Sequence, residues 1–228
     1  MNGDLVMLGT IHRDPQGSAR LSAALAGLDW GLISVEVSPY ALSFRRRQGP
    51  ALLAEVERNL PLAASQAGLD LEAARQHPGL AWLRAYLNLP HEWTASQEQA
   101  ARRGAPCVAL DFSLVSRGLL AETDQLVSAA NLAQVLASPA PASAGLERRR
   151  AADLLAGRGG WPRPPAPEPE REAGLARRLR RLLAAGGRRG RLPLAHVGGW
   201  QHLLAGQDPP TLADRLGVPV AQRILIWA

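Results

Sequence analysis

Two histidines that are far apart in the sequence each stand three residues after a glycine. Gly9 and His12 belong to the motif Gly-Thr-Ile-His, and Gly199 and His202 belong to the motif Gly-Trp-Gln-His. An apolar run precedes each motif. Neutral imidazole is the commonest metal ligand among side chains. The repeated Gly-x-x-His pattern is therefore a candidate metal site, provided that the fold brings the two motifs together.

Two carboxylates complete this candidate site. Glu36 lies near the end of the apolar run 32–37, and Asp111 ends the run 106–111. A carboxylate inside a buried strand is costly unless it is paired or bound to a metal. Two histidines and one carboxylate (His12, His202 and Glu36) suit divalent Zn, Mn, Fe or Co and leave positions open for water and substrate. Such a metal activates water for hydrolysis.

The same residues have a second interpretation, which the spacing supports equally well. Glu36 forms a buried ion pair with Arg45 or Arg46, and the two motif histidines are hydrogen-bonded residues of a pocket. In that case no metal is needed to compensate the buried carboxylate.

Other polar and aromatic residues stand close to the motifs in sequence. Asp14 follows His12 and is expected either to line the site or, with better support, to close an Asx turn in the loop. His196 is expected to be a core histidine, with a supporting role beside the site as the alternative. Trp200 lies inside the second motif, where its large side chain is expected to narrow the pocket.

The motifs need a sheet to bring them together. Apolar runs at 5–8, 32–37, 106–111, 192–197 and 224–227 predict strands, with helical patterns between them. Strands separated by helices predict an α/β fold with a mostly parallel central sheet and flanking helices. Ligands bind at the carboxyl ends of such strands, where both motifs begin.

The sequence predicts one α/β domain over residues 1–228 with two additions. Helical patterns fill the region from about 39 to 104, with an insertion over about 50–104 that Pro50 and Pro61 are expected to divide into separate helices. Residues 157–173 hold five prolines and little apolar content, which predicts a mobile surface loop.

Composition narrows the class of protein. The 228 residues are 46% hydrophobic and 20% charged, as in a folded protein, and the single cysteine excludes an intramolecular disulfide. No run resembles a membrane span or a secretory signal, so we expect a cytoplasmic protein. The net charge of +6 comes from arginines alone, with two Phe and two Tyr, so nucleic acid is an improbable partner.

The order of these blocks resembles that of a known family. Gly-Thr-Ile-His is followed by Ile-Ser-Val-Glu at 33–36, by an arginine nine residues later, by Val-Ala-Leu-Asp at 108–111, and by the second Gly-x-x-His. This order is similar to that of the TraB/PrgY family and its relatives, the TIKI metalloproteases and the wider EreA/ChaN-like superfamily. The resemblance covers about a third of the chain.

The resemblance implies an EreA/ChaN-like fold and a set of site residues. These are His12, Glu36, Arg45 and His202, with Asp111 nearby. It implies a metal-dependent, peptidase-like hydrolase in which Arg45 binds a substrate carboxylate or a developing oxyanion. The alternative is a non-catalytic protein that binds a peptide, a signal molecule or haem in the same pocket.

Overall fold

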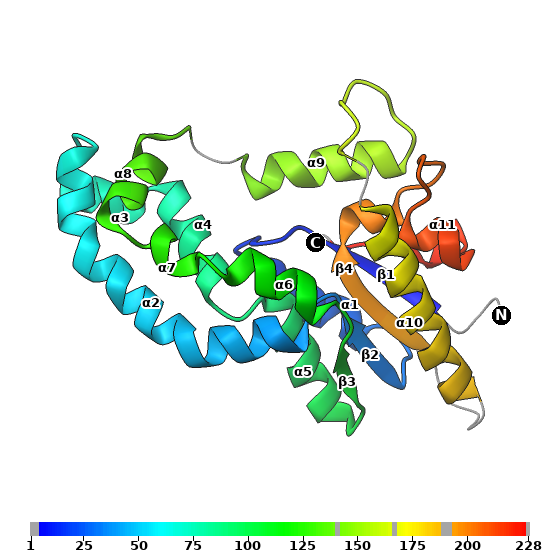
Figure 1. The fold of residues 1–228 in the computed structure, drawn as a ribbon. Coiled ribbons are helices and arrows are strands. Elements are labelled where there is room, and N and C mark those ends of the chain that lie inside the picture. The colour runs from blue at the N-terminus through cyan, green and yellow to red at the C-terminus, as the bar shows by residue number, and fades with distance from the viewer. Residues whose placement is uncertain (1–4, 140–141, 166–167, 188–192, 227–228) are drawn as a thin grey trace. The chain divides into compact units, whose positions relative to one another are not determined.

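The computed structural model describes residues 5–139, 142–165, 168–187 and 193–226 (Figure 1). Its sheet contains β1 (Leu5–Thr10), β2 (Leu32–Val35), β3 (Cys107–Ala109), β4 (Leu194–Gly199) and β5 (Arg223–Leu225). The strand order is β3-β2-β4-β1-β5, and every pair is parallel. The predicted α/β fold with a parallel sheet is confirmed.

The strand register explains how the two motifs meet. β1 and β4 are neighbours, with Gly9 opposite Gly198 and Thr10 opposite Gly199. Both Gly-x-x-His motifs therefore leave the sheet at the same level. Val35 pairs with Val197, so Glu36 follows β2 beside the same glycines.

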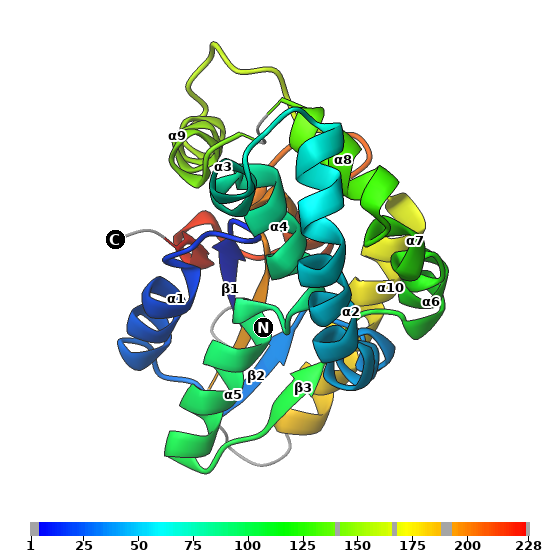
Figure 2. The same ribbon diagram turned by 90° about the vertical axis from the view of Figure 1, so that its left-hand side faces the viewer.

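The chain divides into two compact units, of which the first contains the sheet. Unit 1 comprises residues 1–37, 91–111 and 143–228. Helices α1 (Gly17–Ala26) and α5 (His91–Arg103) cover one face of its sheet, and α10 (Pro169–Gly187) covers the other (Figure 2). Fully buried leucines anchor these helices, including Leu21 and Leu25 of α1 and Leu175 and Leu179 of α10.

The remaining elements of unit 1 surround the end of β4. They are α9 (Ala144–Leu155), the 3-10 helix η1 (Trp200–Leu203), α11 (Leu212–Leu216) and the 3-10 helix η2 (Val220–Gln222). Trp200 and Leu204 pack with Ile11 and Ala151 in one buried cluster. This cluster holds η1, and with it His202, against the end of β1.

Unit 2 is helical and comprises residues 38–90 and 112–142. Its elements are α2 (Pro39–Gln66), α3 (Leu71–Gln76), α4 (Pro78–Leu87), α6 (Ser113–Leu120), α7 (Thr123–Leu126) and α8 (Ala129–Ala137). Its core includes Val56, Leu60, Leu80 and Leu132.

Helix α2 contradicts one prediction. Pro50 and Pro61 were expected to separate helices, but α2 continues through both. A proline inside a helix removes one hydrogen bond, to the carbonyl four residues earlier. Both prolines are exposed, so water can reach the carbonyls that they leave without a helical partner.

The proline-rich segment also differs from expectation. Residues 157–173 were predicted to form a mobile loop, but helix α10 begins at Pro169, so Pro169–Ala173 is helical. Proline is favourable in the first helical turn, where its missing N–H has no helical partner to lose. Glu172 is buried in this turn. Residues 166–167 lie outside the described part of the chain.

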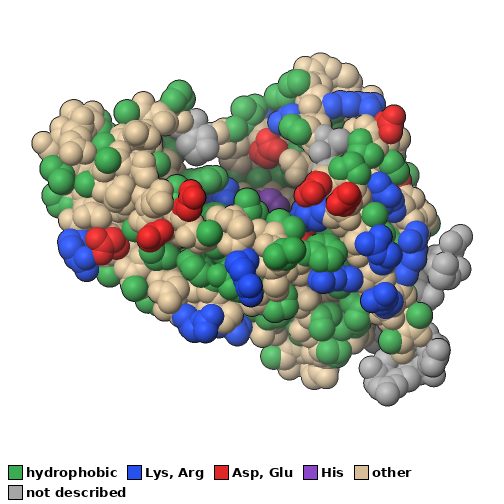
Figure 3. Space-filling view, viewed as in Figure 1, with side chains coloured by type: hydrophobic (Ala, Val, Ile, Leu, Met, Phe, Trp, Pro, Cys, Tyr) green, Lys and Arg blue, Asp and Glu red, His purple; other side chains and the backbone are tan. Residues whose placement is uncertain are grey.

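The surface of the described residues is mixed in character. Arginine side chains gather over α10, and apolar side chains are exposed on α6, among them Leu114 and Leu119 (Figure 3). No described helix has the length and apolar character needed to span a membrane.

Candidate functional site

Glu36 is the centre of the candidate site. Its side chain is 4% exposed and both carboxylate oxygens have partners. Oε2 lies 2.8 Å from His202 Nε2 and accepts a hydrogen bond of 2.9 Å from the Gly199 N–H. Oε1 accepts a hydrogen bond from Arg171 Nη2.

The charges around Glu36 keep it ionised. Burial alone raises the pKa of Glu36, but the positive charges of His202 and Arg171 outweigh burial and hold it well below its ordinary value of 4.5. The site therefore contains a permanent buried carboxylate at neutral pH.

His202 lies between two carboxylates. Its Nε2 faces Glu36, and its Nδ1 is 2.7 Å from Glu172 Oε1, an ion-pair distance at an angle unlike that of a hydrogen bond. Burial lowers the pKa of His202, but Glu36 and Glu172 raise it to about 10. The ring is therefore an imidazolium in this arrangement.

Arg171 connects Glu36 to Asp111. Its Nε and Nη2 donate to the two oxygens of Asp111 at 3.1 and 2.8 Å, a fork geometry that only arginine offers. Asp111 thus lies beside the site, as predicted. The equally weighted ion-pair interpretation of Glu36 was right about the type of contact, but its partner is Arg171 on α10 and was not among the predicted arginines.

His12 forms a second histidine–carboxylate pair. Its Nδ1 is 2.7 Å from Glu92 Oε1, and the Thr10 hydroxyl lies 3.1 Å from the same oxygen. Desolvation lowers the pKa of His12, whereas Glu92 raises it, and the net shift is upward. Burial raises the pKa of Glu92, but His12 lowers it to about 2. The His12 side chain is 54% exposed, so solvent reaches this side of the site.

Gly198 and Gly199 allow the side chains of the site to lie close to the backbone of β4. A Cβ atom at position 198 would lie 2.7 Å from Glu36 Oε2, and one at position 199 would lie 3.0 Å from His12 Nε2. Contacts this short are excluded for real Cβ atoms at the first position and tight at the second. A side chain at position 198 would therefore displace Glu36, and one at position 199 would crowd His12.

His196 lies inside the sheet beside this cluster. Its Nδ1 is 3.0 Å from Ser34 Oγ, while Nε2 is buried and has no hydrogen-bond partner among the described residues. Burial dominates and lowers the pKa of His196 to about 4, so the ring is neutral. His196 is thus a buried histidine of the sheet, and the nearby charge of Glu36 opposes part of the effect of burial on its pKa.

Asp14 and Trp200 serve local packing. Asp14 accepts a hydrogen bond from the Gln16 N–H, which closes an Asx turn, and its other oxygen pairs with Arg20 and Arg148. Trp200 is buried beneath α9 and donates from Nε1 to Glu147 Oε1 at 3.1 Å.

Arg45 and Arg46 belong to unit 2. Arg45 donates from Nε to the Tyr86 carbonyl at 2.9 Å and lies over the Tyr86 ring. Arg46 is exposed on the same helix. The guanidinium that contacts Glu36 comes instead from Arg171.

Comparison with known proteins identifies no family for the chain. No family model matches the sequence. No curated protein matches it, and no solved structure matches the fold. Functional inference therefore depends on the geometry described above.

Whether a metal can bind at this site depends on which imidazole nitrogen atoms point toward it. Among the described residues, no three His, Cys, Asp or Glu side chains are arranged as a ready metal site. The donor atoms nevertheless have suitable chemistry. His202 Nε2 and Glu36 Oε2 are neighbours, and His12 Nε2 lies across the space that a Cβ at position 199 would occupy. Loss of the His202 proton would free the ring for a metal.

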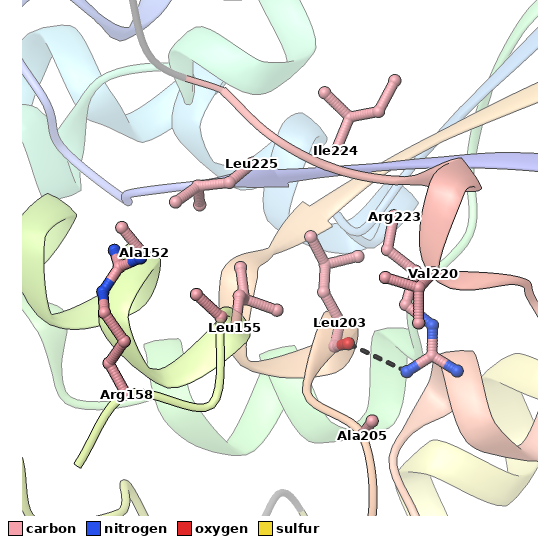
Figure 4. Close-up of a pocket in the computed structure, with 10 residues that line it drawn as sticks. Ala152, Leu155, Arg158, Leu203, Ala205, Val220, Arg223, Ile224 and Leu225 are labelled. Atoms are coloured by element: carbon pink, nitrogen blue, oxygen red, sulfur yellow. Dashed lines mark hydrogen bonds between the residues drawn. The ribbon is translucent and has the colours of Figure 1, made fainter.

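A separate cavity of about 470 Å³ lies between α9, η1 and β5 (Figure 4). Its lining is largely apolar, with Leu155, Leu203 and Leu225 facing the space, and Arg223 donates to the Leu203 carbonyl at 3.0 Å. No titratable residue of the strand-end site lines it. The chemistry and the cavity therefore occupy different places in unit 1.

Proposed function

We propose that this chain is a metal-dependent hydrolase whose site lies at the carboxyl ends of β1, β2 and β4. The observation that carries the proposal is the convergence of His12 Nε2, His202 Nε2 and Glu36 Oε2 around Gly198 and Gly199. The resemblance of the motif order to the TraB/PrgY family and the TIKI proteases supports the same activity.

The residues of the site have distinct roles in this proposal. His12, His202 and Glu36 hold a divalent Mn, Zn, Co or Fe ion, which when bound supplies an activated water molecule for hydrolysis. Glu36 enters this set as an ionised carboxylate because Arg171 stabilises its charge, and this contact does not depend on the proton that His202 loses when it binds the metal. His12 provides the solvent-accessible side, where a peptide or a small-molecule substrate approaches.

Arg171 and Arg45 have different parts in the proposal. Arg171 holds Glu36 and Asp111 in place through charge-assisted hydrogen bonds. Arg45 belongs to unit 2, where it donates to the Tyr86 carbonyl, and the proposal assigns it no contact with the strand-end site.

Metal analysis of protein purified without chelator tests the proposal. We expect Mn, Zn, Co or Fe at close to one ion per chain, lost in His12→Ala and in His202→Ala. His77→Ala is the matched control, because His77 caps α4 in unit 2. The proposal is wrong if none of these metals copurifies and none raises the melting temperature of the wild-type protein.

A non-catalytic binding protein is the second candidate. One observation favours it: both oxygens of Glu36 and both nitrogens of His202 already have protein partners. Such a site binds a peptide, a signal molecule or haem without turnover. Tight ligand binding in a protein that hydrolyses none of a broad ester, amide and peptide panel would select this candidate.

A further inference from the structure

The two motif histidines share a contact that the motifs do not contain. His12 Nδ1 is 2.7 Å from Glu92 Oε1, and His202 Nδ1 is 2.7 Å from Glu172 Oε1. Glu92 belongs to α5 and Glu172 to α10, on opposite faces of the sheet (Figure 2). Two unrelated helices thus place a carboxylate at the same nitrogen of each ring, as a hydrogen-bond partner of His12 and as an ion-pair partner of His202.

Both glutamates are buried and fixed by further contacts. Their side chains are 7% and 1% exposed. Glu92 is held by the Thr10 hydroxyl, and Glu172 Oε2 accepts a hydrogen bond from the Leu212 N–H. A buried carboxylate is costly unless it is paired. The orientation of each glutamate is therefore set independently of the histidine that it contacts.

We infer that Glu92 and Glu172 are positioning residues that direct Nε2 of His12 and His202 toward Gly198 and Gly199. A carboxylate beside Nδ1 favours a proton on that nitrogen. When the His202 imidazolium loses one proton on binding a metal, Nε2 is therefore the atom that becomes the electron-pair donor, and the carboxylate makes it a stronger ligand. This inference rests on the proposed metal site. It adds two residues, outside both motifs, that determine how tightly the metal is held.

Metal affinity measured by titration calorimetry tests the inference. Zn²⁺ is titrated into wild-type protein, Glu92→Gln and Glu172→Gln. Loss of the outer carboxylate weakens metal binding by roughly 10–100-fold in comparable sites, and we expect a decrease of that size for each variant. The matched controls are Glu98→Gln and Glu170→Gln, exposed glutamates on the same two helices, for which we expect unchanged affinity.

The position of the ring protons provides a readout that does not depend on the variants folding. In Zn²⁺-loaded wild-type protein, nitrogen-detected NMR of both imidazoles should place the proton on Nδ1 for His12 and for His202. A proton on Nε2 of either ring would overturn the inference for that histidine.

The outcomes separate the inference from the proposed function. Wild-type protein that binds no Zn²⁺ overturns both. Wild-type protein that binds Zn²⁺ while Glu92→Gln and Glu172→Gln bind it within about threefold of the wild-type affinity overturns only the inference, because a role confined to fold stability would leave the affinity of a folded variant unchanged.

Discussion

Replacement of Arg171 by methionine should destabilise unit 1 severely. Arg171 contacts both Glu36 and Asp111, whose side chains are 4% and 10% exposed. Methionine keeps much of the length but removes the charge, so Glu36 and Asp111 each lose a charged partner, and Glu36 keeps only His202 and the Gly199 N–H. Breaking a buried ion pair in this way costs about 3–5 kcal/mol, and for a chain of this size that lowers the melting temperature by roughly 6–20 °C.

The assay is thermal unfolding followed by circular dichroism at several pH values. Arg177→Met is the control, because Arg177 is exposed on the same helix and its loss should change stability by no more than about 0.5 kcal/mol. The effect of Arg171→Met should be largest at pH 7. It should shrink as the pH falls, because without Arg171 the buried carboxyl of Glu36 takes up a proton more readily.

The wild-type protein should show the complementary trend. The pKa of Glu36 is lower in the folded protein than its ordinary value, so its ionisation stabilises the fold above that value, and this contribution is lost as the pH falls through the folded pKa. An Arg171→Met protein that melts within about 2 °C of the wild type at pH 7 would refute this account of the Glu36–Arg171–Asp111 contacts.

Three further predictions concern the glycines, the histidine and the loop. Gly198→Ala should lower the free energy of unfolding by about 1–3 kcal/mol, because the new Cβ meets Glu36 Oε2. The control Gly118→Ala, at a position in helix α6 with open space, should be neutral or stabilising. Equal melting temperatures for the two variants would contradict the crowding at Gly198. The pKa of His202 is raised to about 10 in the folded protein, so the charged ring stabilises the fold fully below pH 6.5 and loses this effect as the pH rises toward 10. The melting temperature of the wild type should therefore decline over that range more steeply than that of His202→Gln. Trypsin should cleave after Arg158 before it cleaves after Arg171, because Arg171 is helical and paired. If the first cleavage occurs at Arg171, helix α10 does not begin at Pro169.

Much of the fold could be predicted because its signals are local. Strands β1 to β4 contain short, mainly apolar runs that end at or just before a glycine or a charged residue. Buried parallel strands have near-continuous apolar sequences of this kind. The two Gly-x-x-His motifs and Glu36 could be placed at strand ends for the same reason. The register of β1 and β4, which sets Gly9 opposite Gly198, then brings the motifs together.

The partners of these residues could not be predicted so directly, because they come from distant helices. The resemblance implied Arg45 as a site residue, and Arg45 or Arg46 was expected to pair with Glu36 in the ion-pair interpretation. The structure provides Arg171 as the contact. Glu172 carried a usable signal: it stands three, four and seven residues before the buried Leu175, Ala176 and Leu179, on the same face of α10.

Glu92 carried a similar signal on α5. The buried residues Ala95, Ser96, Gln99 and Ala100 follow it at helical spacing. The side chains on this face of α5 are small or polar, so the sequence pattern of α5 is hard to distinguish from that of an exposed helix. The loop prediction failed at Pro169, which is the first residue of α10, because proline favours the first turn of a helix as well as a loop.

The most direct test of the proposed site is a crystal structure of the protein soaked in Co²⁺, with anomalous diffraction recorded at the cobalt edge. The account predicts a single anomalous peak beside Gly199, in contact with Nε2 of His12, Nε2 of His202 and a carboxylate oxygen of Glu36. Well-ordered crystals with no peak at the strand ends, and with Glu36 still paired to His202 and Arg171, would contradict it.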